Sequence, residues 1–144
     1  MTKKNEVQVE IGILKIKDLG FFLDELIDSG EDSGLVYNLN IGQNIQEEWI
    51  EFMLEAQFKN KTTGETFLSG KASTRFLIKN LKDFVVSDSL NLPPDAMTTM
   101  FSMSFTHTRA ILSKNTAGSK FDNMYLPIVN PGELLNNFFN QVPS

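Results

Sequence analysis

The 144-residue chain contains no cysteine, so it has no disulfide bond, no thiolate metal ligand and no thiol nucleophile. It contains a single histidine, which argues against a histidine-rich zinc site and leaves a catalytic triad only one candidate base. None of its glycines is followed by Lys and then Ser or Thr, as a phosphate-binding loop requires. These absences predict a protein that is not an enzyme and carries no metal ion or cofactor.

Basic residues are also in short supply. Thirteen Lys and Arg stand against 18 Asp and Glu, for a net charge of -5, and the acidity lies in the first half of the chain. A negative protein repels nucleic acid and anionic lipid, so neither partner is expected. No apolar run is long enough for a signal peptide or a membrane span. The sequence therefore predicts a cytoplasmic protein.

The length and composition fit one globular domain covering residues 1–144. The chain is 41% hydrophobic and 22% charged, and a domain of this size can bury enough surface to fold without disulfides. Its 12 phenylalanines exceed average usage. This surplus fits a core, an oligomer interface or a groove for apolar segments of another chain.

The first strand is predicted at residues 7–16, where apolar and polar side chains alternate as in a strand with one buried face. Residues 19–27 are largely apolar and fit either a short helix or an extended crossover, and both interpretations stay open. A loop at residues 29–34 precedes a second predicted strand at residues 35–41.

The strongest local pattern is a β-hairpin at residues 49–78. Its first strand presents an apolar face made of Ile50, Phe52, Leu54, Ala56 and Phe58. A turn at residues 60–65 leads to a return strand at residues 66–78. The small Gly70 and Ala72 on the return strand would let another element pack closely.

Two helices are predicted after the strands. Pro93, Pro94 and Asp95 favour the start of a long helix that ends near Gly118. Its apolar stripe has helical spacing and consists of Met97, Met100, Phe101, Ser104, Phe105, Thr108, Ile111 and Leu112. From this stripe we assign Met97, Met100, Phe101 and Phe105 to an oligomer interface.

The shorter helix is expected to begin at Asn130, which can cap it, with Glu133 completing a capping box. Leu134, Leu135, Phe138 and Phe139 form its apolar face. Strands followed by helices, without alternation, predict an α+β domain in which a four-stranded antiparallel sheet is covered on one side by a long helix and a shorter C-terminal helix.

Residues 92–135 contain a proline-led helix with the segment 108–113 (Thr-Arg-Ala-Ile-Leu-Ser), then Gly118, Phe121 and the segment 126–130 (Leu-Pro-Ile-Val-Asn) before Leu134. This pattern resembles the SecB family of chaperones. The order of elements is also similar over nearly the whole chain. Thr108, Pro131 and the order of Pro127 and Ile128 depart from the family pattern, so the resemblance is to a divergent member.

The resemblance implies an ATP-independent chaperone that holds unfolded polypeptides or preproteins in apolar grooves and assembles as a tetramer of paired dimers. Phe21, Phe22, Leu23 and Leu26 of the crossover, with Phe138 and Phe139 of the last helix, are the expected client-binding residues. The family also uses an acidic sheet face to engage the export motor SecA. Such a face could be built here by residues at outward-facing positions of the predicted strands: Glu10, Glu51 and Glu55. An alternative is an interaction module of the same fold with one dedicated partner, such as an antitoxin-type protein or a secretion factor.

His107 and Arg109 are the remaining candidates for chemistry. His107 lies off the apolar stripe and has no nucleophile and carboxylate adjacent in the sequence, so a solvated or interface histidine is expected. Arg109 is expected to form an ion pair or to bind backbone carbonyls.

Overall fold

The computed structural model describes residues 8–30 and 32–139. Four long strands come first: β1 (Ile11–Leu23), β2 (Ser33–Asn44), β3 (Trp49–Asn60) and β4 (Thr66–Ile78). A 3-10 turn, η1 (Leu81–Phe84), and a small hairpin of β5 (Val85–Val86) and β6 (Ser89–Leu90) lead to the helices α1 (Pro94–Thr116) and α2 (Pro131–Phe139). The predicted α+β architecture is confirmed.

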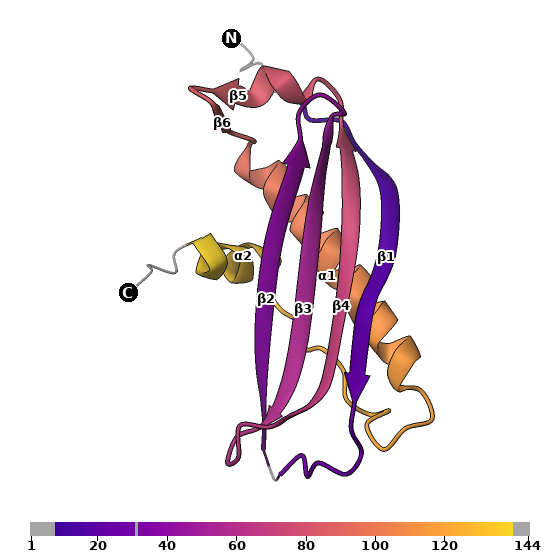
Figure 1. The fold of residues 1–144 in the computed structure, drawn as a ribbon. Coiled ribbons are helices and arrows are strands. Elements are labelled where there is room, and N and C mark those ends of the chain that lie inside the picture. The colour runs from indigo at the N-terminus through magenta and orange to yellow at the C-terminus, as the bar shows by residue number, and fades with distance from the viewer. Residues whose placement is uncertain (1–7, 31, 140–144) are drawn as a thin grey trace.

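The four strands form one antiparallel sheet in the order β1-β4-β3-β2, which places β1 and β2 on opposite edges (Figure 1). The hairpin β3–β4 occupies the centre, as predicted. Along β3 every second side chain is buried, beginning with Ile50, and the alternate side chains from Trp49 onward face away from α1. We call the face covered by α1 the inner face and the opposite one the outer face.

The core lies between the inner face and α1. Phe52 of β3 and Phe76 of β4 are fully buried and meet edge to face, with ring centroids 5.8 Å apart. A Cβ added to Gly70 would lie 2.9 Å from Cδ1 of Leu112 on α1. The predicted close approach at Gly70 is therefore confirmed, and the element that approaches is α1.

β1 differs from its prediction. The strand begins at Ile11 and runs to Leu23, so the helical interpretation of residues 19–27 is wrong and the extended one is right up to Leu23. Two shifts in its register with β4 leave Leu14 and Leu19 without partners. Such bulges change which face the following side chains occupy. Of the predicted buried face, Val9 and Ile11 pack partly buried against the core, but Ile13 is 45% exposed and most of β1 is exposed; Val7 lies outside the described residues.

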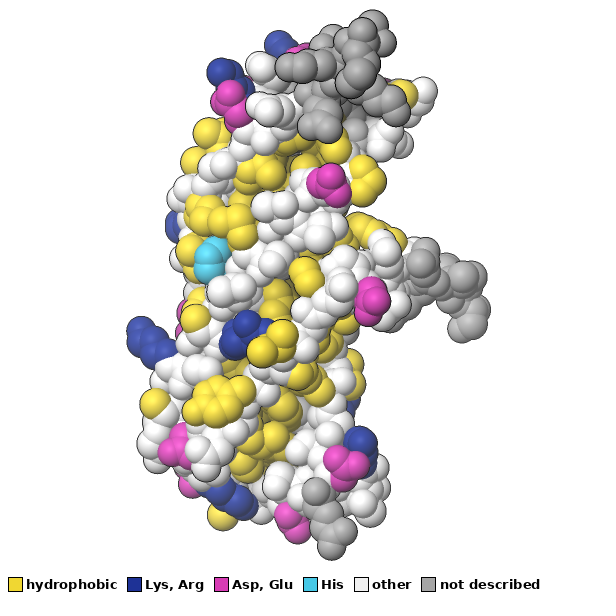
Figure 2. All heavy atoms as spheres, turned by 180° about the vertical axis from the view of Figure 1, so that it is seen from behind, with side chains coloured by type: hydrophobic (Ala, Val, Ile, Leu, Met, Phe, Trp, Pro, Cys, Tyr) yellow, Lys and Arg dark blue, Asp and Glu magenta, His cyan; other side chains and the backbone are white. Residues whose placement is uncertain are grey.

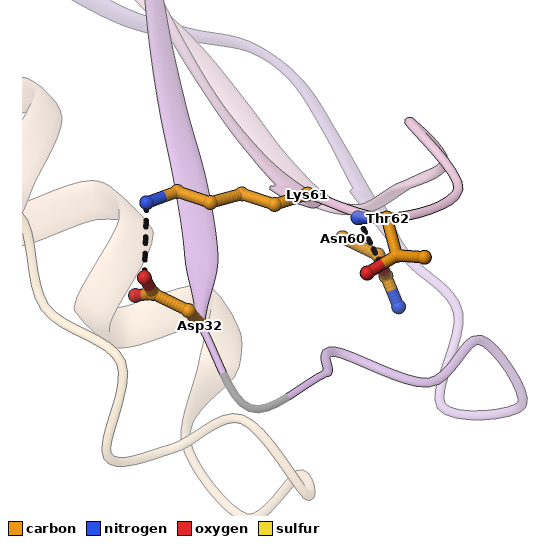
Figure 3. A network of polar contacts seen from close by, with 4 residues as sticks. All are labelled: Asp32, Asn60, Lys61 and Thr62. Atoms are coloured by element: carbon orange, nitrogen blue, oxygen red, sulfur yellow. Dashed lines mark hydrogen bonds and ion pairs between the residues drawn. The ribbon is translucent and has the colours of Figure 1, made fainter.

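The connection from β1 to β2 is anchored to the β3–β4 turn. Asn60 donates from Nδ2 to the carbonyl of Asp28 at 2.8 Å, and its Oδ1 accepts from the amides of Thr62 and Thr63. Lys61 pairs with Asp32, Nζ to Oδ2, at 3.1 Å (Figure 3). One amide side chain thus shapes the hairpin turn and fixes the crossover beside it.

α2 begins as predicted, because Oδ1 of Asn130 accepts from the amide of Glu133 at 3.1 Å and Pro131 is the first helical residue. The helix is held to α1 through Phe138, whose ring lies 6.0 Å from that of Phe101. Its axis projects past the β2 edge of the sheet (Figure 1). No helix in the described part of the chain is long and apolar enough to cross a membrane.

Candidate functional site

Exposed apolar side chains gather along β1. Six of them are between 39% and 50% exposed, and we call them the β1 patch: Ile13, Leu14, Ile16, Leu19, Phe21 and Phe22. The patch exists because α1 packs chiefly on β4 and β3, which leaves much of β1 uncovered. Figure 2, which views the molecule from the helix side, shows hydrophobic side chains exposed over much of its length.

A second apolar site lies at the opposite edge of the sheet. A hollow of about 380 Å³ opens between β2, the start of α1 and the end of α2. We call it the α2 hollow, and its apolar lining is Ile41, Ile50, Leu90, Leu92, Met97 and Phe139. Phe139 is 58% exposed and Ile41 is 36% exposed, so two of its walls offer apolar surface that no part of the described chain covers.

The edge of β2 continues this site. Among residues 8–30 and 32–139, β2 pairs with β3 alone, so within this part of the chain its other edge presents unpaired backbone amides and carbonyls. Beside that edge a more polar hollow of about 390 Å³ is lined by Tyr37, Asn38, Leu39, Asn40, Glu55, Lys71 and Phe138. Because Phe138 lines this hollow and Phe139 lines the other, α2 borders both.

The structure separates the six predicted client-binding residues into two groups. Phe138 and Phe139 lie on α2 beside β2, whereas Phe21, Phe22 and Leu23 lie at the end of β1 on the far edge of the sheet. Phe21 shares the inner face with Gly70, Phe22 shares the outer face with Ser69, and Leu23 packs against the core. Leu26 is 95% exposed in the turn that follows. One chain therefore does not join them into a single groove.

The predicted oligomer-interface residues are mostly core. Met100, Phe101 and Phe105 are buried within the chain, at 0%, 0% and 3% exposure, because they face the sheet. Burial of this degree leaves them no surface for a second copy, so that assignment is corrected for these three. Met97 is partly exposed and lines the α2 hollow.

The predicted acidic face is not acidic. Glu51 and Glu55 do lie on the outer face, but Glu51 pairs with Arg75 at 2.9 Å, and Glu55 accepts from the side-chain amides of Asn38 and Gln57. Glu10 precedes β1 and pairs with Lys79 at 3.6 Å. The sequence missed the basic side chains that the register of β1 and β4 brings to the same face.

His107 is less solvated than predicted. Its Nδ1 lies 2.9 Å from Oγ1 of Thr74, a buried residue of β4, and partial burial lowers the pKa of the imidazole. Arg109 binds a backbone carbonyl, as expected: Nη2 donates to the carbonyl of Pro127 at 2.9 Å, and the guanidinium lies over Phe105. Both side chains act in packing α1 against its neighbours.

Several residues of the two apolar sites were missed from the sequence. Ile41, Leu90 and Leu92 come from three separate segments, so their convergence on the α2 hollow depends on the fold. The β1 patch could have been predicted from the sequence, because apolar residues occupy both odd and even positions between residues 11 and 23. A strand with two apolar faces at the edge of a sheet must leave some of that surface open.

The fold is similar to that of a solved chaperone. The SecB-like chaperone Rv1957 of Mycobacterium tuberculosis, in complex with a ChAD peptide from the HigA1 antitoxin, matches over 83% of this chain and 90% of its own, with a TM-score of 0.54 and 12% sequence identity. Neither a protein-family model nor a curated protein matches the sequence. The predicted SecB-like fold is thus confirmed.

Proposed function

We infer that this chain is an ATP-independent chaperone that binds extended apolar segments of unfolded polypeptides. The observation that carries the inference is the pairing of an uncovered apolar hollow with a free strand edge, at α2 and β2. An unfolded segment presents the two complementary features, apolar side chains and unpaired backbone groups. Binding would extend the sheet by one strand and bury client side chains against α2.

The energetics favour clients with large apolar residues. Full burial of one Leu or Phe side chain contributes about 1.5–3 kcal/mol, so two such residues in the α2 hollow offset much of the entropy lost by an ordered segment. The shape of the client side chain is less constrained, since Met97 and Phe139, which line the hollow, can adopt several rotamers. This favours recognition of composition over a fixed sequence.

The solved neighbour supports a polypeptide as the partner, because that protein of similar fold is bound to a peptide of an antitoxin. The same fact favours a second candidate, a module with one dedicated protein partner. Denatured substrates of unrelated sequence separate the two functions. A general chaperone should suppress the aggregation of each, whereas a dedicated module should suppress none.

Replacing Phe139 by aspartate is expected to abolish this suppression. A carboxylate in the α2 hollow would have to lose its hydration when an apolar client side chain binds. The measurement is light scattering of a denatured substrate diluted into stoichiometric protein without ATP. Ile128→Asp is the matched control, because Ile128 is 95% exposed and lies outside the hollow. Equal suppression by both variants would show that the hollow does not bind clients.

We also infer that the chain forms a homo-oligomer through the β1 patch. An edge strand with six exposed large apolar residues is a surface that soluble proteins normally cover. A dimer through β1 would cover it, and pairing of dimers would give the tetramer that the resemblance implies. Such an assembly could also bring Phe21 and Phe22 of one copy nearer to α2 of another.

Lysine at Ile13 and Ile16 is expected to shift the oligomer to smaller species. Both side chains are on the inner face of β1, and charge there would oppose burial against a second copy. Light scattering after size-exclusion chromatography gives the mass of each variant. Leu26→Lys serves as the control, since it adds a charge at a fully exposed turn outside the patch. A wild-type chain that is monomeric at all concentrations would contradict the inference.

A further inference from the structure

The outer face of the sheet is a regular surface that the described helices leave bare. α1 crosses behind the sheet and α2 lies past the β2 edge, so no helix covers the front of the sheet in Figure 1. Its charge is opposite to that of the whole protein. Five basic and two acidic side chains lie on it, a net charge of +3 on a chain of -5: Lys15, Lys17, Lys59, Lys71, Arg75, Glu51 and Glu55.

The register concentrates the positive charge on β1 and β4. Lys15 lies opposite Arg75, and Lys17 lies opposite Ser73, so both lysines share the outer face. Lys71 is two residues before Ser73 on β4 and has the same parity. We call Lys15, Lys17 and Lys71 the lysine cluster.

Carboxylates on the same face neutralise this cluster only in part. Glu51 is engaged by Arg75, whose guanidinium also lies 3.9 Å from the centroid of the Trp49 ring. Glu55 is opposite Lys71, but its Oε1 accepts from Asn38 and Gln57. Among the residues that the structure describes, no ion pair involves a lysine of the cluster.

The positive charges also affect the pKa of a lysine in the cluster. The pKa of Lys15 is lowered, first by hydrogen bonding with the Lys17 side chain and then by the positive charge of Lys17. An anion between these ammonium groups would relieve that repulsion. Ser69 and Asn40 on the same face add neutral donors and acceptors for a polypeptide backbone.

We propose that the lysine cluster on the outer face docks an acidic polypeptide segment of a partner protein. Three lysines on the outer face of two adjacent strands match carboxylates spaced along an extended peptide. Nucleic acid fits less well, because Glu51 and Glu55 lie in the path of a phosphate backbone and the protein as a whole repels it. None of the three lysines lines the α2 hollow, which requires apolar side chains, although Lys71 lines the more polar hollow beside β2.

Fluorescence anisotropy with a labelled polyglutamate peptide tests the proposal, with polyglutamine of the same length as the neutral probe. The full chain should bind polyglutamate at low ionic strength and release it as salt is added. The triple variant Lys15→Gln, Lys17→Gln and Lys71→Gln should bind about tenfold more weakly, since each exposed pair contributes modestly. Polyglutamate has no apolar side chain, so the result does not depend on client binding.

Two further variants make the outcome decisive. The first is a second triple variant, with Lys61→Gln, Lys82→Gln and Lys114→Gln. It removes the same number of positive charges at positions away from the outer face, and it should bind polyglutamate nearly as well as the wild type does. Arginine at the three cluster positions should restore binding if the triple glutamine variant is poorly folded. Equal losses in both glutamine variants, or wild-type affinity no greater for polyglutamate than for polyglutamine, would overturn the proposal. Tighter binding of single-stranded DNA than of polyglutamate would overturn the choice of a polypeptide.

Discussion

Replacing Phe101 by alanine is expected to lower the free energy of unfolding by about 3–5 kcal/mol. Phe101 is fully buried, and its ring lies 6.1 Å from that of Phe105 and 6.0 Å from that of Phe138. Alanine would leave a cavity between α1, α2 and the sheet that the rigid strands cannot close. Because single domains are stable by only about 5–15 kcal/mol, this one change removes a large share of the total.

The same substitution should loosen α2. α2 contacts the body of the chain through few residues, and Phe138 packs on Phe101. Amides of α2 should therefore exchange hydrogen faster than those of β3 in the variant. Urea unfolding at a fixed protein concentration gives the loss of stability.

Phe139→Ala is the matched control for Phe101→Ala. It also removes a phenylalanine side chain, from α2 instead of α1. Because Phe139 is 58% exposed, the free energy of unfolding should change by no more than about 0.5 kcal/mol. A Phe101→Ala variant as stable as Phe139→Ala would contradict the packing of α2 described here. Client binding should be affected in the opposite order. Phe139→Ala should weaken it more than Phe101→Ala does, because Phe139 lines the α2 hollow.

The central hairpin could be predicted from the sequence because both of its faces are unambiguous. β3 alternates Ile50, Phe52 and Leu54 with Glu51, Met53 and Glu55, and its pairing with β4 shifts register only near the turn, between Phe58 and Lys59. Period-two alternation then fixes the face of each side chain. α1 was predictable for the same reason, since proline begins it and its apolar stripe has helical spacing.

β1 was harder because local pattern and tertiary position disagree there. Its bulge at Leu14 puts Ile13 and Ile16 on one face although they are three residues apart. A strict period of two assigns them to opposite faces. Nor does the sequence give the direction in which α1 crosses the sheet, which decides whether β1 is covered.

The candidate site was predicted only in part. Phe138 and Phe139 were named from the sequence, and both line hollows beside β2. Their partners were not, because Ile41 and Leu90 reach the site through the docking of α2 and the small β5–β6 hairpin. The charge of the outer face was missed for a related reason: Lys15 and Lys71 join one face only through the pairing of β1 with β4.

Valine at Gly70 is expected to destabilise the protein by about 1–3 kcal/mol or more through overpacking. Valine is a better strand former than glycine, so local propensity alone predicts stabilisation. The added Cβ would lie 2.9 Å from Cδ1 and 3.8 Å from Cβ of Leu112, which is itself buried against the sheet. A loss of stability would therefore show that α1 lies this close to β4, and a gain would show that it does not.

Gly42→Val is the matched control, because Gly42 is also in a strand and a Cβ there would meet no atom within 4 Å. It should be neutral or slightly stabilising. Leu112→Ala alone should cost about 2–5 kcal/mol, but combined with Gly70→Val it should cost less than the sum, since the valine fills the space that Leu112 vacates. Strict additivity in urea unfolding of the four proteins would show that the two residues do not touch. A favourable coupling would locate the contact that sets the distance of α1 from β4.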